Sequence, residues 1–475
     1  MLFNSWVFLL FLAVVLPVYY SLNTRFQNIF LIVASYFFYG YWDYRFLSLI
    51  VISTTVNYTI ALGIQTAAGK KKKKLLIIGI ILNLGFLGFF KYYHFFIDSL
   101  SDVFQILGFS PVTSTLKIIL PLGISFYTFQ AMAYIIDVYL GRQTATKDKI
   151  SFALFICYFP LLLAGPIERA GHLLPMLQSK RVVRREDVTA GIQLILIGLV
   201  KKIAIADAVA PFVNRLYQDC NGHMSLDLLC GVYLFAIQIY GDFSGYSDIA
   251  RGVSKLLGID LIMNFRQPYF SKNIVEFWRR WHISLSGWLR DYLYIPMGGN
   301  RKGKWKTYRN LMITMLLGGL WHGASWVFVI WGGLHGAYLA LHRIFKEITK
   351  KEIRENSRSW KTAVITWFSV FVTFHLTSVA WVFFRSPDLR TAGVYLLRLA
   401  SPANWGYGDA SLVQATVFYL LFTFLLDLPQ YLADRELLLT AGTHWIWRGL
   451  TYAMLMVMIS FIGESYVQPF IYFQF

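Results

Sequence analysis

Two histidines stand in runs where their chemistry would be unusual. His322 lies in the apolar run Leu-Leu-Gly-Gly-Leu-Trp-His-Gly (316–323), and His282 lies in the more polar run 276–286. A neutral imidazole can take a proton from a hydroxyl near pH 7, and an ionisable group inside a membrane segment usually serves a function. The flanking glycines leave room for a ligand or a second backbone. We predict that His322 is a general base and that His282 faces the same cavity; the alternative is a pair of hydrogen-bonded structural histidines.

Other kinds of catalytic site lack their residues. The sequence contains no HExxH metal motif, no Gly-x-Ser-x-Gly nucleophile elbow and no phosphate-binding loop. Its three cysteines, Cys157, Cys220 and Cys230, form no CxxC pair. We therefore expect no bound metal and no disulfide framework.

The composition fixes the environment in which these histidines work. Of 475 residues, 57% are hydrophobic and only 15% are charged, yet the formal net charge is +19. A soluble domain cannot bury this much apolar surface, because its exterior must remain wettable. The chain is therefore predicted to be an all-α polytopic membrane protein with a single domain over residues 1–475.

Apolar segments long enough to cross a bilayer, which needs about 20 residues of helix, recur along the chain. We expect about 10–12 membrane segments. Ten candidate crossings cover residues 5–22, 28–41, 46–64, 75–97, 117–140, 188–210, 228–250, 362–384, 411–430 and 449–470.

Lys and Arg in short loops mark the cytoplasmic side. The run Lys70–Lys74 and the ten Lys/Arg of residues 266–309 are the clearest examples. Counting crossings from Lys70 places both chain ends outside the cytoplasm. The positive charge therefore lies in loops that flank the membrane, where nucleic-acid binding is not expected.

Residues 310–341 do not fit a simple crossing. Both flanks, 266–309 and 343–361, are basic and therefore cytoplasmic, so the segment must enter the membrane and return as a re-entrant hairpin broken at Trp321–Gly323. Its first limb spans about 18 Å of helix, near the middle of the bilayer. Residues 151–166, interrupted by prolines, have the same character. Irregular backbone at that depth needs surrounding protein or water, which predicts a central tunnel with His322 at its bottom.

The polar run around His282 has apolar and aromatic residues at helical spacing, at positions 274, 277, 278, 281, 285 and 288. With charged residues on its other face, it is typical of an interfacial helix along the cytoplasmic surface. We assign residues 266–310 to a cytoplasmic or interfacial amphipathic segment. The alternative is a membrane anchor without a catalytic part.

Five strings together resemble the membrane-bound O-acyltransferase family, in particular its bacterial polysaccharide O-acetylation branch. The strongest are FWRRWHISLSGWLRDYLYIPMGGNRKG (277–303) and LLGGLWHGASWVFVIWGGLHG (316–336). PLGISFYTFQ (121–130), AGPIERA (164–170) and YGDFSGYSDIARG (240–252) extend the likeness over most of the chain. The Ile-Pro-Met-Gly-Gly-Asn stretch favours this branch over the teichoic-acid D-alanylation proteins.

This resemblance implies a helical ring with re-entrant segments around the tunnel. It places the family's invariant histidine at His322 and its second active-site position at His282. It also implies acyl transfer from cytoplasmic acetyl-CoA, as donor substrate, to an extracytoplasmic hydroxyl, in the bacterial inner membrane and together with an extracytoplasmic acetyltransferase and a polysaccharide. The basic inner surface independently suits an anionic donor. We expect the donor to contact Arg279, Arg280, Trp281, Ser286, Arg290 and Asn300.

Three other functions compete with this interpretation. A transporter also breaks its helices at mid-membrane, but it would normally show mirrored halves, and none are visible. A scaffold for an extracytoplasmic transferase would release no coenzyme A. Within the enzyme class, a D-alanyl or longer-chain acyl transferase is the nearest alternative.

Overall fold

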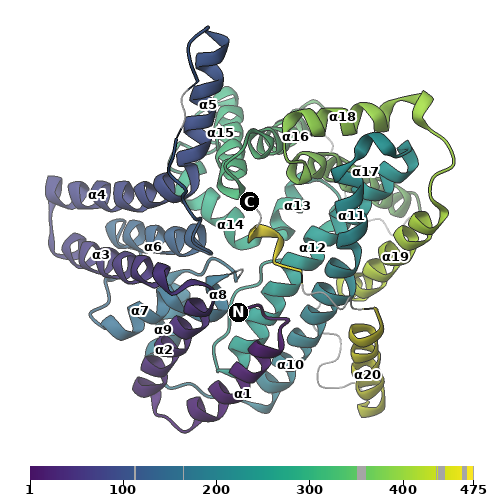
Figure 1. The fold of residues 1–475 in the computed structure, drawn as a ribbon. Coiled ribbons are helices and arrows are strands. Elements are labelled where there is room, and N and C mark those ends of the chain that lie inside the picture. The colour runs from purple at the N-terminus through teal and green to yellow at the C-terminus, as the bar shows by residue number, and fades with distance from the viewer. Residues whose placement is uncertain are drawn as a thin grey trace. The chain divides into compact units, whose positions relative to one another are not determined.

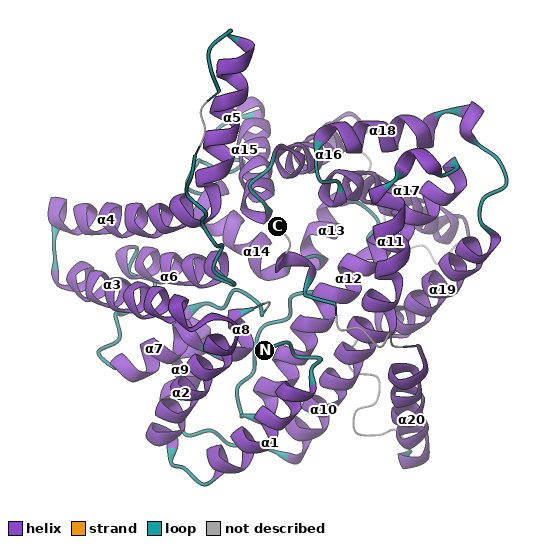
Figure 2. Ribbon diagram, in the orientation of Figure 1, coloured by secondary structure: helices purple, strands orange, loops and turns teal. Residues whose placement is uncertain are grey.

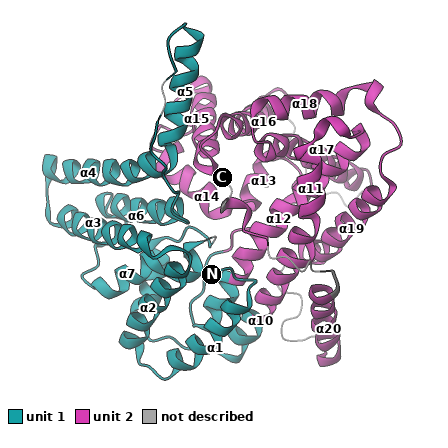
Figure 3. Ribbon diagram, viewed as in Figure 1, with its two compact units in different colours: residues 1–191, 250–262 teal, residues 192–249, 263–475 magenta. Residues whose placement is uncertain are grey.

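The computed structural model describes residues 1–111, 114–163, 165–349, 360–434, 436, 444–462 and 468–473. Within these ranges the regular structure is helical and no strand occurs (Figures 1 and 2). Six stretches are long and apolar enough to cross a membrane. The prediction of an all-α polytopic membrane protein is therefore confirmed, while the tunnel remains a prediction. The residues divide into two compact units, 1–191 with 250–262, and 192–249 with 263–475 (Figure 3).

Unit 1 contains the amino-terminal helices. In it α3 packs against α4 and α6, and α2 packs against α7. Two helices, α10 (Arg185–Leu199) and α12 (Ser225–Leu256), contribute residues to both units. The helices that lie wholly in unit 1 are α1 (Trp6–Tyr20), α2 (Thr24–Asp43), α3 (Leu47–Thr66), α4 (Gly69–Leu87), α5 (Tyr93–Ile106), α6 (Ile124–Tyr139), α7 (Lys149–Cys157), α8 (Phe159–Leu162) and α9 (Ala170–Gln178).

Two sequence predictions are tested by the local structure of unit 1. The expected break near Pro160 is confirmed, because α7 ends at Cys157 and proline opens the short helix α8. The expected crossing 117–140 begins late, at Ile124. Gly123 has φ +72° there, and a Cβ atom on it would lie 1.9 Å from the Leu162 carbonyl oxygen. This close approach requires glycine and delays the helix.

Unit 2 contains both predicted catalytic histidines. After α10 the chain continues through a π-helix, Val200–Asp207, into α11. The following helices of unit 2 are α11 (Ala208–Gln218), α13 (Ile274–Arg280), α14 (Ile283–Leu289), α15 (Lys304–His322), α16 (Trp326–Thr349), α17 (Trp360–Arg385), α18 (Leu389–Ala400), α19 (Ala410–Ala433) and α20 (Trp445–Ile462).

Helices α15 and α16 pack against each other as a helical hairpin, with the break directly after His322; the re-entry of this hairpin into a membrane remains a prediction. Their backbones touch at glycines. A Cβ atom on Gly319 would lie 2.1 Å from the Phe328 carbonyl oxygen, and one on Gly332 would lie 2.2 Å from that of Met315. The sequence suggests that these glycines leave room either for a ligand or for a second backbone. The structure shows the second use, close approach of two backbones.

The prediction of a last crossing over 449–470 is wrong at its end. Helix α20 ends at Ile462, and residues 468–473 form a separate carboxyl-terminal tail with a 3₁₀ turn at Ile471–Phe473. The tail contains Pro469, which has no N–H to donate and which fits poorly inside a helix. Residues 463–467 lie outside the described residues. In Figure 1 the tail is the yellow segment near α14.

Candidate active site

His322 is the last residue of α15 and is only 3% exposed. Its ring is surrounded by aromatic rings from several elements of unit 2. The nearest centroids belong to Trp321 and Trp331, each at 5.0 Å, and to Phe384 and Tyr472, each at 5.5 Å. The end of the helix thus places the imidazole among packed aromatic side chains that shield it from water.

His282 lies between α13 and α14 and has φ +43°, in the left-handed region. The expectation of one continuous amphipathic helix through this position is therefore wrong. Few residues other than glycine adopt this conformation, and when they do it is often at functional sites. The turn buries the His282 side chain completely instead of leaving it at an interface.

A buried amide orients His282. The Asn264 side-chain oxygen lies 3.1 Å from His282 Nδ1, and it also accepts from the Ser284 N–H and hydroxyl. Because this oxygen is an acceptor, Nδ1 carries the proton and Nε2 holds the lone pair. Burial lowers the pKa of His282 to about 3, which keeps the ring neutral.

The structure brings the two predicted histidines together although they are far apart in the sequence. Their ring centroids are 6.1 Å apart, with the ring planes inclined at 60°. Trp321 contacts both rings, at 5.8 Å from His282 and 5.0 Å from His322. The two imidazoles therefore share one site.

Two further residues at this site were not identified from the sequence. Asn264 precedes the polar run, and its role depends on the turn at His282. Tyr472 belongs to the carboxyl-terminal tail; its ring lies 4.6 Å from Phe243 and 5.5 Å from His322. A tyrosine in a short aromatic segment carries no local signal for such a contact, and only the folded chain shows it.

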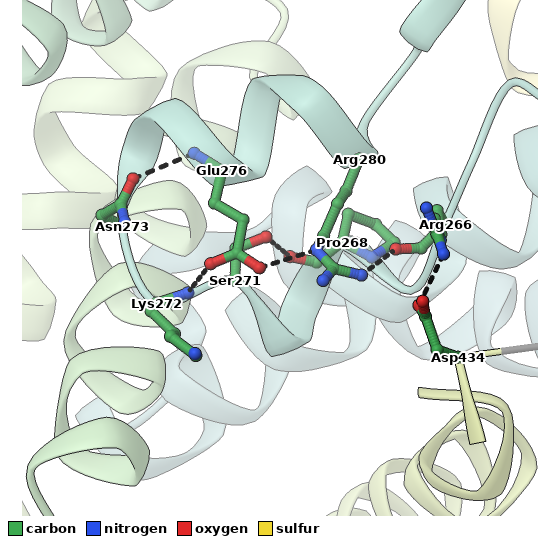
Figure 4. Close-up of polar contacts among 8 residues, drawn as sticks. All are labelled: Arg266, Pro268, Ser271, Lys272, Asn273, Glu276, Arg280 and Asp434. Atoms are coloured by element: carbon green, nitrogen blue, oxygen red, sulfur yellow. Dashed lines mark hydrogen bonds and ion pairs between the residues drawn. The ribbon is translucent and has the colours of Figure 1, made fainter. Parts of the chain in front are cut away.

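A second feature of unit 2 is a basic pocket of about 660 Å³ between α13, α15 and α16. It has six Lys/Arg side chains against one carboxylate, Glu276. Glu276 accepts from the Arg280 side chain and from the Lys272 backbone N–H, each at 2.9 Å; both contacts are drawn in Figure 4. The cationic residues that line the pocket are Arg266, Lys272, Arg279, Arg280, Arg343 and Lys346.

Comparison with known proteins identifies the family. Residues 148–385 match MBOAT, the membrane-bound O-acyltransferase family. The probable alginate O-acetylase AlgI of Pseudomonas putida is 39% identical over all of both chains. The chain belongs to the membrane-bound O-acyltransferase family. It is therefore an O-acyltransferase, and its relatives support membrane O-acetylation.

Two other relatives differ from each other in the acyl group that their names give. The peptidoglycan O-acetyltransferase of Helicobacter pylori is 34% identical, covering 96% of this chain and 93% of its own. The teichoic acid D-alanyltransferase of Bacillus subtilis is 29% identical, covering 55% of this chain and 68% of its own. Likeness to the O-acetylating proteins thus extends over much more of the chain.

The six residues expected to contact the donor of this O-acyltransferase do not lie together. Arg279 and Arg280 line the basic pocket. The other four lie elsewhere: Trp281 is buried against Phe277 and Trp381, Ser286 donates to the Trp281 carbonyl, Arg290 pairs with Asp291, and Asn300 is exposed. Among the described residues there is no group of His, Cys, Asp and Glu that could hold a metal ion.

Proposed function

We propose that this membrane O-acyltransferase moves an acetyl group from cytoplasmic acetyl-CoA to an extracytoplasmic hydroxyl. The product would be an O-acetylated exopolysaccharide, such as alginate, or another cell-envelope polymer. The relatives that match nearly the whole chain, a probable alginate O-acetylase and a peptidoglycan O-acetyltransferase, support acetyl as the acyl group. The observation that carries the proposal is the pair of buried imidazoles, 6.1 Å apart, at the break after α15.

In this proposal His322 is the general base. It takes the proton of the acceptor hydroxyl as that oxygen attacks the thioester carbonyl carbon. A C–O bond forms and the C–S bond breaks, so the acetyl group becomes an ester and coenzyme A leaves as its thiol with the transferred proton. The neutral His282, held by Asn264 through Nδ1, positions the acceptor or assists the proton transfer.

The basic pocket supports an anionic donor. Coenzyme A carries several phosphate charges. Six cations and one carboxylate line the pocket, and although two of the arginines also pair with acidic residues outside it, the remaining excess of positive charge attracts the phosphates. Arginine also binds phosphate oxygens through paired N–H groups. We assign Arg279 and Arg280 to this donor site, together with Arg343 and Lys346, which nothing in the sequence alone marks as donor contacts.

The acceptor side of the reaction is proposed from relatives and from the predicted topology. We propose that the enzyme lies in the bacterial inner membrane and works with an extracytoplasmic acetyltransferase that completes transfer onto the polysaccharide. The second candidate is a D-alanyl transferase. The teichoic acid D-alanyltransferase of Bacillus subtilis supports this candidate, but its match covers only 55% of this chain, so we rank the candidate lower.

The donor can be tested with the purified protein in nanodiscs. We expect free coenzyme A to appear from acetyl-CoA in the presence of an acceptor, and more slowly from octanoyl-CoA at equal concentration. A D-alanyl carrier protein should transfer nothing. Transfer from that carrier with none from acetyl-CoA would reject acetyl-CoA in favour of the second candidate, and substrate movement without coenzyme A release would indicate a transporter.

A further inference from the structure

The carboxyl-terminal tail, residues 468–473, is fixed at two backbone positions by buried charged side chains. The Lys202 ammonium donates to the Gln468 carbonyl at 3.1 Å, and the Ile471 N–H donates to an Asp242 carboxylate oxygen at 2.6 Å. Both side chains come from helices far from the tail in the sequence. The tail is therefore held by specific polar contacts as well as by its apolar side chains.

The charged group behind these contacts is a buried cluster that we name the tail clamp: Lys202, Asp207 and Asp242. Lys202 Nζ lies 2.7 Å from Asp207 Oδ1 and 2.8 Å from Asp242 Oδ1, and the three side chains are at most 4% exposed. Burying one cation with two carboxylates is costly unless each charge is well paired. The tail completes this pairing, since Asp242 uses its second oxygen for Ile471.

The clamp determines where the tail's rings lie. With the Ile471 N–H fixed, Phe470 and Tyr472 are placed on either side of it. Phe470 is fully buried 4.6 Å from the Tyr246 ring, and the Tyr472 ring lies 4.6 Å from Phe243 and 5.5 Å from His322. Asp242 and Phe243 are adjacent on α12, so one helix turn holds the tail backbone and supports the Tyr472 ring.

We propose that Lys202, Asp207 and Asp242 are positioning residues that hold the carboxyl-terminal tail in place, so that Tyr472 forms one wall of the His322 site. In this proposal the clamp acts on the His322 site through the tail, whose backbone it holds at Gln468 and Ile471. This inference rests on the proposed role of His322, but the attachment of the tail can be measured without any activity.

The chain offers a matched control next to the clamp. Lys201, on the same π-helix, forms a similarly buried ion pair with Asp248, at 2.8 Å. Lys201→Met therefore breaks a comparable buried pair without removing the acceptor of Ile471. Asp242→Ala removes that acceptor and the charge, whereas Asp242→Asn removes the charge but keeps an oxygen that can accept from Ile471.

The test is hydrogen–deuterium exchange of the tail in the full-length protein, read by mass spectrometry alongside steady-state kinetics. We expect Asp242→Ala to speed exchange across residues 468–473 at least tenfold and to lower kcat at least tenfold, with the KM for acetyl-CoA unchanged. Asp242→Asn should give a tail exchange rate and a kcat between those of Asp242→Ala and the wild type. Lys201→Met should leave the tail exchange rate unchanged.

Two results would overturn the proposal. One is tail exchange that is the same in Asp242→Ala and Lys201→Met, because the clamp would then not hold the tail. The other is faster tail exchange with a normal kcat, because the tail would then not build the site. If the wild type transfers no acetyl group at all, the proposed function fails, while the exchange data still decide the attachment.

Discussion

The rings of His282 and His322 lie 6.1 Å apart, and Trp321 contacts both. One histidine ends a long helix, and the other occupies a left-handed turn between two short helices. Each backbone feature points its imidazole into the same aromatic site. A neutral imidazole can take a proton from a hydroxyl. The arrangement supplies two imidazoles, and Asn264 fixes the tautomer of His282.

The orientation of His282 depends on Asn264, which leads to a first prediction. Asn264→Ala removes the acceptor for His282 Nδ1 and for both Ser284 donors. Partners that orient a functional histidine typically contribute about 10–100-fold where they have been measured at metal sites. We expect kcat to fall about tenfold or more with little change in the KM for acetyl-CoA, as measured by coenzyme A release. An unchanged kcat in correctly folded protein would show that this orientation is unimportant.

The burial of His282 predicts a pH dependence of stability. In the unfolded chain this ring takes a proton near pH 6.5, whereas burial lowers its folded pKa to about 3. The unfolded state therefore binds more protons below pH 6.5, and stability falls as the pH falls. At pH 5 the loss is about 2 kcal/mol. The melting temperature should drop more between pH 7.5 and pH 5 in the wild type than in His282→Asn; equal drops would contradict the buried neutral ring.

Because α15 packs closely on α16, we predict that alanine substitutions at two neighbouring glycines differ sharply in their effect on the melting temperature. A Cβ atom on Gly332 would lie 2.2 Å from the Met315 carbonyl oxygen, whereas one on Gly333 would meet only the Leu316 side chain, at 3.4 Å. Overpacking of this kind costs about 1–3 kcal/mol. Gly332→Ala should lower the melting temperature by several degrees, and Gly333→Ala should change it little. Similar melting temperatures for the two variants would argue against the hairpin contact.

The basic pocket predicts a change in donor binding that leaves the chemistry intact. Replacing Arg279 and Lys346 together by Gln removes two of its six cations. We expect the KM for acetyl-CoA to rise about tenfold, with a weaker dependence on salt, and kcat to change little. Arg390→Gln, on α18 and outside the pocket, is the matched control. A normal KM in the double variant would place the donor elsewhere.

The sequence predicts the parts of this protein that depend on local pattern. Basic flanks on both sides of residues 310–341 are enough to predict a hairpin broken near His322, because charge near a membrane determines which side a loop occupies. The same local pattern fails at His282. Helical spacing of aromatic residues there predicts one interfacial helix, but tertiary packing bends the chain and buries the ring.

Long-range contacts account for most of what the sequence does not predict. Asp242 accepts a hydrogen bond from the tail, although more than two hundred residues separate the two in the sequence. Lys202 lies on a π-helix, which hydropathy does not distinguish from an α-helix. The place of Tyr472 beside His322 follows from those contacts. Similarly, nothing in the spacing of Arg279 and Arg343 shows that they line one pocket.

A comparison of His322→Ala with His375→Ala tests most directly whether His322 is the general base. His375 is a histidine of α17 whose ring contacts Tyr233. General base catalysis contributes about 10²–10⁴-fold. With both variants purified in nanodiscs at equal amounts, we predict that His322→Ala loses acetyl transfer from labelled acetyl-CoA by at least a hundredfold, while His375→Ala retains it. Acetyl transfer by folded His322→Ala at the rate of the control would contradict the account.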